Sequence, residues 1–228
     1  MVSWNFAPVW ANADLLLAGA LNTLAVTGAA LAFGVPLGLA LALARLSPRR
    51  ALSWPAGAVI EAFRTTPPLV QLFWFFFALP ILVHVEMTPY VAAVLTFSIQ
   101  SSAFFAEVFR AGIASVERGQ WEAARALGMR PPQVMRRIVL PQAVKRMVPA
   151  FLERAIELMK TTTLVATISY ADLLFQANEV AQKTFRPLEV FTVVALAYFV
   201  VIFAASEVVR FVERRLAASG EGLGATGH

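Results

Sequence analysis

The sequence predicts an all-α integral membrane protein with about five transmembrane helices. Hydrophobic residues make up 59% of the chain and charged residues only 14%, which is more apolar than soluble domains usually are. Residues 15–44 carry no charged side chain, and this run is longer than the roughly 20 residues that a helix needs to cross a bilayer. The basic residues gather in alternate loops between the apolar segments, as they do in multi-pass membrane proteins.

The spanning segments are expected, in order, at about 15–44, 61–83, 88–110, 146–172 and 188–212. The first contains Gly34 and Gly38 at the GxxxG spacing, which favours close packing against another helix. The fourth is apolar but is interrupted by charged residues, which are Glu153, Arg154, Glu157 and Lys160. One transmembrane domain, residues 15–216, therefore accounts for most of the chain.

The basic residues also predict the orientation of the chain in the membrane. Most of them lie in the first loop, the third loop and the C-terminal tail (Arg45, Arg49, Arg50; Arg118, Arg125, Arg130, Arg136, Arg137, Lys145, Arg146; Arg210, Arg214, Arg215). Because positively charged loops stay in the cytoplasm, the segment 1–14 is expected outside and the C-terminus inside. The small, polar tail 217–228 is expected to be disordered. The net charge of +5 thus reflects topology and not nucleic-acid binding.

The second segment contains Pro67-Pro68, a pair that removes two amide donors and disfavours helical geometry before each ring. In a membrane, such a break is tolerated where protein or a water-filled cavity satisfies the freed carbonyls. One interpretation is a flexible point or a wall of a polar pathway. The other, which we favour, is a helix that starts at Pro67 and follows a short interfacial helix with Glu61 and Arg64.

The third loop, about residues 117–141, is expected to form two short helices. The first ends at Gly128, because glycine can adopt the left-handed conformation that caps a helix. Pro131 or Pro132 can open the second, since the first helical turn needs no N–H from them. One face of the second helix is apolar and consists of Val134, Met135, Ile138 and Val139. The loop is therefore predicted to be a compact, ordered docking element.

This loop resembles the cytoplasmic EAA loop in the permease subunits of bacterial ATP-binding-cassette (ABC) importers. In that family, Glu-Ala-Ala is followed after three residues by Gly and after nine more by Ile-x-Leu-Pro, and the same spacing occurs here. The matching residues are Glu122, Ala123, Ala124, Gly128, Ile138, Leu140 and Pro141. The resemblance implies the type I ABC importer permease fold, with these residues and Gly119 coupling the chain to an ATPase.

Further motifs resemble the permeases for polar amino acids, of the histidine, glutamine and glutamate type. Residues 63–73 (FRTTPPLVQLF) look like the signature of their second helix, and residues 105–120 match the run from the third helix into the loop. Lys160-Thr161-Thr162-Thr163-Leu164 resembles Lys-Asp-Thr-Ser-Leu in the fourth helix. The similarity covers roughly residues 15–212. Two departures are Glu153, where Asn is common, and Thr162-Thr163 in place of the usual Thr-Ser context.

The fourth helix is the best candidate for lining a substrate pathway. Glu153, Glu157 and Lys160 lie within about 60° of one another around a helix and form one charged stripe. Lys160 would lie about 20 Å along the helix, inside a hydrocarbon core about 30 Å thick, where ionisable groups by default mark a functional face. The alternative is a Glu157–Lys160 pair that only fixes packing. Gln100 and Thr161 complete the set of candidate pathway residues.

An enzyme is the first competing class of protein, and the sequence lacks the residues for it. There is no cysteine, only two histidines, and neither GxSxG nor HExxH, so no catalytic or metal site is expected. A GxxxxGK[ST] phosphate loop is also absent from the sequence. The chain is therefore expected to hold no cofactor, with ATP and magnesium bound by a partner ATPase.

The resemblance implies a permease subunit that moves a polar amino acid across the bacterial inner membrane, with its N-terminus periplasmic and its C-terminus cytoplasmic. Expected partners are a cytoplasmic ABC ATPase dimer, a second permease subunit (identical or homologous), a periplasmic solute-binding protein and the lipid bilayer, but no nucleic acid. Two alternatives remain open. One is a permease for another small polar solute, and the other is a membrane scaffold or receptor without a conduction path.

Overall fold

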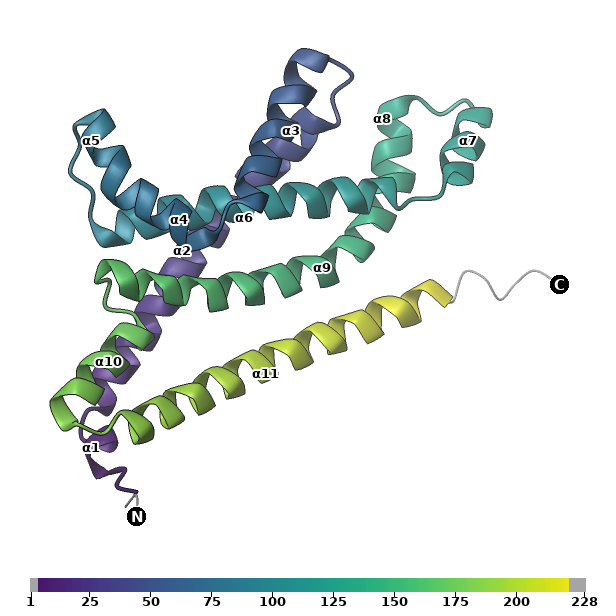
Figure 1. The fold of residues 1–228 in the computed structure, drawn as a ribbon. Coiled ribbons are helices and arrows are strands. Elements are labelled where there is room, and N and C mark those ends of the chain that lie inside the picture. Colours follow the sequence, from purple (N-terminus) through teal and green to yellow (C-terminus); the bar gives the residue numbers. More distant parts are fainter. Residues whose placement is uncertain (1–3, 222–228) are drawn as a thin grey trace.

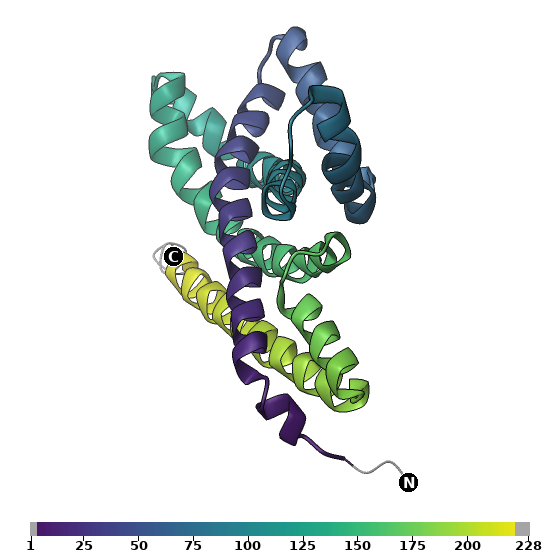
Figure 2. The same cartoon turned by 90° about the vertical axis from the view of Figure 1, so that its left-hand side faces the viewer.

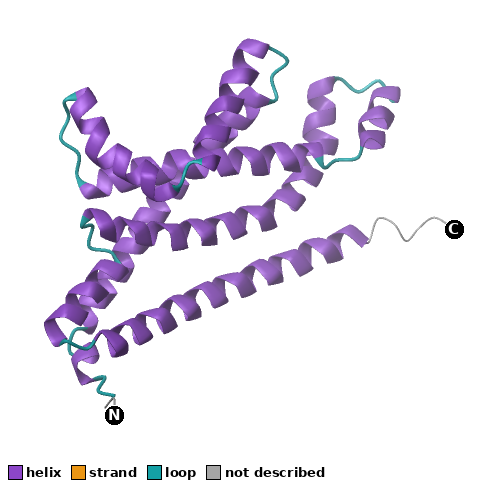
Figure 3. Ribbon diagram, viewed as in Figure 1, coloured by secondary structure: helices purple, strands orange, loops and turns teal. Residues whose placement is uncertain are grey.

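The computed structural model describes residues 4–221, and within that range all regular secondary structure is helical (Figures 1 and 3). The helices are α1 (Ala7–Trp10), α2 (Ala13–Arg45), α3 (Arg50–Thr65), α4 (Pro68–Phe73), the π-helical turn η1 (Trp74–Ala78), α5 (Leu79–Val83), α6 (Pro89–Ala114), α7 (Arg118–Ala126), α8 (Pro131–Val134), the π-helical turn η2 (Met135–Val139), α9 (Leu140–Thr161), the 3₁₀ segment η3 (Thr162–Ile168), α10 (Leu173–Thr184) and α11 (Pro187–Glu221). The all-α prediction is confirmed for the described residues.

Three helices in the described range are long and apolar enough to cross a membrane: α2, α6 and residues Pro187–Leu216 of α11. A fourth span results if α3 and Pro68–Val83, which meet at an angle of 106°, are taken together. The remaining predicted span is α9, which has 22 residues but carries the charged stripe that lowers its hydropathy. At the C-terminal end, α11 continues to Glu221, and residues 222–228 of the predicted disordered tail lie outside the described range.

The predicted break at the proline pair is confirmed. α3 ends at Thr65, Thr66 is extended with ψ of 133°, and α4 begins at Pro68 rather than at Pro67. The extended conformation follows from the clash between a proline ring and a helical residue before it. Glu61 and Arg64 lie on a separate preceding helix, as we favoured, but α3 is longer than a short interfacial turn because it starts at Arg50.

The fourth predicted segment, 146–172, differs from the structure at both ends. Its helix begins before residue 146, because α8, η2 and α9 follow one another without a gap. The α-helix ends at Thr161 and is followed by the tighter 3₁₀ helix. In its first two residues, the hydroxyls of Thr162 and Thr163 donate to carbonyls three residues earlier. Ser169 then takes a left-handed conformation with φ of 61° and separates this segment from α10.

α2 and α6 form the central crossing of the molecule, and α2 runs along its length (Figures 1 and 2). Gly34 and Gly38 lie at the crossing, and a Cβ at Gly38 would be 2.8 Å from the Cβ of Phe105 on α6. The absence of side chains at these two positions allows the close packing that the GxxxG spacing predicted. α9 also packs against α6, and α11 packs against α9 and α10.

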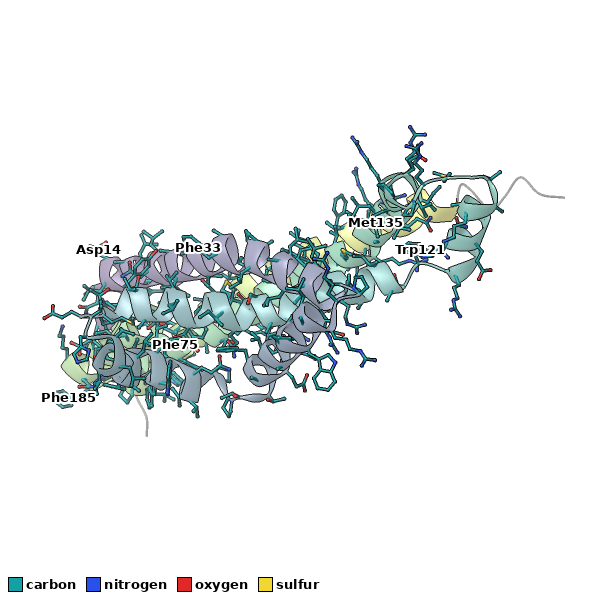
Figure 4. All side chains as sticks on the ribbon, turned by 90° about the horizontal axis from the view of Figure 1, so that it is seen from above. Asp14, Phe33, Phe75, Trp121, Met135 and Phe185 are labelled. Atoms are coloured by element: carbon teal, nitrogen blue, oxygen red, sulfur yellow. The ribbon has the colours of Figure 1, made fainter. Side chains whose placement is uncertain are left out.

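The molecule has two distinct ends (Figure 4). Asp14 and Phe185 lie at one end, whereas Trp121 and Met135 lie at the other, on a loop that projects beyond the helix bundle. This projecting loop contains α7 and α8, and α9 leads from it back into the bundle (Figure 1). The predicted coupling loop and the predicted pathway helix are therefore directly connected.

Candidate functional site

α7 ends in a Schellman motif centred on Gly128. The N–H of Gly128 donates to the carbonyl of Arg125 at 2.9 Å, and the N–H of Met129 donates to the carbonyl of Ala124 at 3.1 Å. Gly128 has φ of 76°, a backbone conformation that residues with a side chain rarely adopt. No neighbouring group lies within 4 Å of where its Cβ would be. Backbone conformation, and not lack of space, therefore requires glycine here, as predicted.

The second helix of the loop opens at Pro131 and is not a separate short helix. It runs through η2 into α9, and the Ile138–Pro141 motif lies where the helix widens into a π turn, with the N–H of Leu140 donating to the carbonyl of Met135. Pro141 has no N–H to bond the carbonyl of Arg137, and this loss is a recognised cause of a helix irregularity. The motif thus marks a bend between the loop and α9 (Figure 1).

A small apolar core fixes the loop against the ends of α6 and α9. Its buried members are Val116, Ala124, Val134, Val139, Ala143 and Met147, with Trp121, Met129, Met135 and Ile138 partly buried around them. The predicted apolar face of the second helix is therefore confirmed, and Arg136 and Arg137 are exposed. The loop is an ordered element and not a flexible connection.

The predicted coupling residues divide into an inner and an outer group. Ala124 and Ile138 belong to the loop core, whereas Gly119, Glu122 and Ala123 on α7 are exposed. Leu140 and Pro141 are exposed on the bend, and Leu127, which follows α7, is 82% exposed. The outer group is the part of the motif that a partner protein can contact.

A cavity of about 80 Å³ lies between α6 and α9, and three of the predicted pathway residues line it: Gln100, Glu157 and Thr161. Pro68, the first residue of α4, also lines it. Gln100 comes from the buried face of α6, and Glu157 and Thr161 lie one helical turn apart on α9. The structure therefore brings together polar residues that are far apart in the sequence.

A larger cavity of about 370 Å³ lies next to the first, on the side of the coupling loop. Glu153 lines it together with Arg64, Glu107, Arg146 and Arg154. Five of its lining residues are charged, whereas only Arg154 and Glu157 are charged in the lining of the smaller cavity. Lys160 lines neither cavity and is exposed on α9, so the structure separates it from the other four predicted pathway residues.

Arg154 is the residue that our sequence analysis missed. It lines both cavities, forms an ion pair with Glu157, and places its guanidinium 4.7 Å from the ring centroid of Phe104. The Glu157–Lys160 pair that we considered is thus replaced by a Glu157–Arg154 pair. The i,i+3 spacing of Arg154 and Glu157 was a usable signal, but only the packing of α6 shows that the pair faces a cavity.

Residues 4–221 contain no acidic or histidine cluster arranged to hold a metal ion.

Comparisons with known proteins agree with this architecture. The chain is 34% identical to the glutamate/aspartate import permease protein GltK of Escherichia coli O6:H1, over 95% of this chain and 100% of the relative. It is 36% identical to the L-cystine transport system permease protein TcyB of Bacillus subtilis, over 89% and 86% of the two chains. A putative glutamine transport system permease protein GlnP of Rickettsia bellii is 34% identical, over 90% and 94%.

Solved structures show the same fold. A crystal structure of an amino acid ABC transporter with histidines has a chain that superposes with a TM-score of 0.90 at 34% identity, covering 94% of this chain and 100% of that one. The MetNI methionine ABC transporter in an inward-facing conformation superposes with a TM-score of 0.67 at 22% identity, which supports the fold alone. Residues 34–218 match the family described as binding-protein-dependent transport system inner membrane component. The chain belongs to that family of ABC importer permeases.

Proposed function

We propose that this chain is the transmembrane subunit of an ABC importer that carries a polar amino acid from the periplasm to the cytoplasm. The observation that carries the proposal is the cavity between α6 and α9, where Arg154 and Glu157 present opposite charges side by side. An amino acid also carries one positive and one negative group, so the pair can exchange its internal contact for contacts with both groups of the substrate. The names of the glutamine, glutamate/aspartate and cystine permeases among its relatives support the same substrate class.

In the proposed pathway, the substrate passes from the smaller cavity to the larger one. Gln100 and Thr161 supply neutral hydrogen-bonding groups at the first cavity, and Glu153 lies at the second. Charged side chains in a membrane domain are costly unless they are paired or face water, and here Arg154 and Glu157 form a pair and Glu153 is exposed. Lys160 lines neither cavity and is exposed, so we place it at the interface with a second permease subunit, where it would contribute to the pathway from that subunit's side.

The coupling loop is proposed to bind the cytoplasmic ATPase dimer through its outer group, Gly119, Glu122 and Ala123, with Leu140 and Pro141 at the bend. Ala124, Gly128 and Ile138 keep the loop rigid from within. Because α8, η2 and α9 form one continuous helical segment, a displacement of the loop is passed directly to the helix that carries Glu153 and Glu157. ATP and magnesium are bound by the partner ATPase in this proposal.

The orientation proposed is a periplasmic N-terminus and a cytoplasmic C-terminus in the bacterial inner membrane. The end of the molecule with Asp14 and Phe185 then faces the periplasmic solute-binding protein (Figure 4). The second subunit is expected beside α11, which packs on α9 and α10 but leaves many apolar side chains exposed to a partner or to lipid, among them Leu196, Phe199, Val200 and Phe203.

The test is ATP-dependent uptake of radiolabelled amino acids into proteoliposomes. They would contain this chain with the permease, ATPase and binding protein encoded beside it. Uptake of one class of polar amino acid, competed by unlabelled substrate of that class, is the expected result. An assembled complex that hydrolyses ATP but takes up no polar amino acid would contradict the substrate class, and a chain that binds no ATPase would contradict the importer assignment.

A further inference from the structure

The break between α3 and α4 leaves a helix carbonyl without its usual partner. In a continuous helix, the carbonyl of Phe63 would accept the N–H of residue 67, but Pro67 has none. The chain turns here by 106°, and Thr66 is extended. A freed carbonyl within a membrane protein must find another donor, because an unsatisfied polar group in that environment is costly.

The side chain of Gln71 supplies that donor. Its Nε2 donates to the carbonyl of Phe63 at 2.9 Å and also to the carbonyl of Thr66 at 2.8 Å. One acceptor lies in the last turn of α3 and the other in the residue that precedes the proline pair. Gln71 itself lies in α4 and is only 4% exposed, so a single buried amide connects the two arms of the broken span.

The oxygen atom of this amide shows which of its contacts matter. Oε1 of Gln71 is buried and has no hydrogen-bond partner among the described residues. Gln71 also lines an apolar cavity of about 290 Å³, together with Phe63, Val70, Trp74 and Phe75. Rotating the amide would bring Oε1 against two carbonyl oxygens, so the observed orientation is fixed by the two donations, and the unpartnered oxygen is the cost.

We infer that Gln71 is a positioning residue that replaces the hydrogen bond removed by Pro67 and so fixes the angle between α3 and α4. This angle bears on the proposed transport pathway because each arm contributes to a different cavity. Arg64 on α3 lines the larger cavity, and Pro68 on α4 lines the smaller one. The consequence for transport rests on the proposed function. The connection that the two hydrogen bonds of Gln71 make between α3 and α4, which we call the clamp, does not.

The angle can be measured because the chain contains no cysteine. Spin labels on Trp54→Cys in α3 and Ile81→Cys in α5, both 74% exposed, report the distance between the two arms in the reconstituted complex diluted with unlabelled chain. The labelled positions lie about 18–20 Å from the break, so a change of about 20° in the bend changes the distance between them by about 5 Å. Gln71→Met keeps the size of the side chain but removes both donors, and it is expected to shift or broaden the distance distribution by this amount.

Gln142→Met is the matched control. Gln142 donates to the carbonyl of Ile138 at 3.0 Å, near the start of α9 and outside both arms of the broken span. It is expected to leave the distance between the arms unchanged. An unchanged distribution in Gln71→Met, or an equal shift in Gln142→Met, would overturn the clamp.

The proline pair provides a second test, which distinguishes the hydrogen-bonding role of Gln71 from a packing role. In a Pro67→Ala/Pro68→Ala background, the backbone can supply its own amide donors, so Gln71→Met is expected to cause no further change in the distance. The same change in both backgrounds would show that Gln71 acts only by packing. If Gln71→Met alone does not assemble, recovery of the complex by the two alanines supports the clamp, and failure in both backgrounds overturns it.

Uptake measurements on the same variants separate the two proposals. Gln71→Met is expected to reduce ATP-dependent amino acid uptake about 10-fold or more while ATPase binding persists. Gln142→Met remains the control for the distance between the arms. A shifted distance with full uptake would show that the angle between α3 and α4 does not affect the proposed transport pathway. If the unaltered chain takes up no amino acid, the distance measurements still decide on the clamp, because they need no substrate.

Discussion

Arg154 and Glu157 are the residues on which the proposed substrate binding most depends. They form an ion pair whose side chains are 38% and 57% exposed, so the pair itself contributes little to folding, about 0–1 kcal/mol. Its place on the lining of a cavity gives it another use, since each partner offers a charge to a zwitterionic ligand. A pair held loosely can exchange one partner for another at small cost.

We therefore expect Glu157→Gln and Arg154→Met each to lower amino acid uptake strongly. Loss of one charged hydrogen bond costs about 1.5–3 kcal/mol, which corresponds to a decrease of about 10- to 100-fold. Uptake into proteoliposomes and the melting temperature of the complex would be measured together. Glu179→Gln is the control, because it breaks the similar surface pair with Lys183, 3.4 Å apart, away from both cavities. Normal uptake in both cavity variants would refute the role of the pair.

At the scale of single elements, two backbone devices define the coupling loop. The left-handed residue Gly128 ends α7 and directs the chain to Pro131, and after the π turn before Pro141 the helix continues as α9 into the bundle (Figure 1). The apolar core of the loop holds these two turns in one arrangement. The exposed face of α7 is thereby presented at a fixed angle to α9.

Gly128→Leu is expected to disturb this arrangement. A branched side chain at φ of 76° is strained by about 1–2 kcal/mol, so the Schellman turn should open and α7 should lose its orientation. The expected result is loss of ATPase binding or ATP hydrolysis that no longer drives uptake. Gly28→Leu provides the control, since Gly28 lies in α2 with nothing within 4 Å of its Cβ position. Fully coupled transport by Gly128→Leu would argue against the docking role of the loop.

Pro141→Ala is a second prediction at this scale. It restores an N–H that can bond the carbonyl of Arg137, so the π turn should revert to regular helix and the bend between the loop and α9 should decrease. We expect ATPase binding to persist while uptake per ATP hydrolysed falls several-fold. Pro36→Ala in the interior of α2 removes a proline far from the loop and should leave this ratio unchanged. A normal ratio in Pro141→Ala would show that the bend has no part in coupling.

At the scale of the whole molecule, the crossing of α2 and α6 is the fixed centre around which two ends are arranged. One end carries the coupling loop and the other carries Asp14 and the turn with Phe185 (Figure 4). The cavities lie between these ends, beside α6 and α9. In the proposed orientation, this arrangement would allow a partner on each side of the membrane to act on the proposed pathway.

The orientation of these ends can be tested by labelling single cysteines in a chain that has none of its own. Leu127→Cys and Phe185→Cys occupy positions that are 82% and 88% exposed. A membrane-impermeant maleimide should label Phe185→Cys in spheroplasts with an intact inner membrane and Leu127→Cys only in inside-out vesicles. The reverse pattern would contradict the proposed orientation, and labelling of both positions in permeabilised cells confirms that each thiol is reactive.

The sequence alone determined the features that depend on neighbouring residues. Glycine is needed where a helix ends in a left-handed residue, proline stops the helix before it, and long uncharged runs form spanning helices. The cap at Gly128, the break at Pro67-Pro68, the helices α2 and α6 and the start of α11 were therefore predicted closely. The apolar face around Val134 and Val139 followed from helical periodicity in the same way.

Only the tertiary structure decided which of the polar residues meet. Arg154, and not Lys160, shares a cavity with Glu157, because the packing of α6 against α9 determines which side of the charged stripe borders a cavity. Ala123 and Ala124 are neighbours with equal helix propensity, yet the fold of the loop buries one and exposes the other. Local conformation is set by dihedral preferences and hydrogen bonds within a few residues, whereas these contacts depend on where distant helices cross.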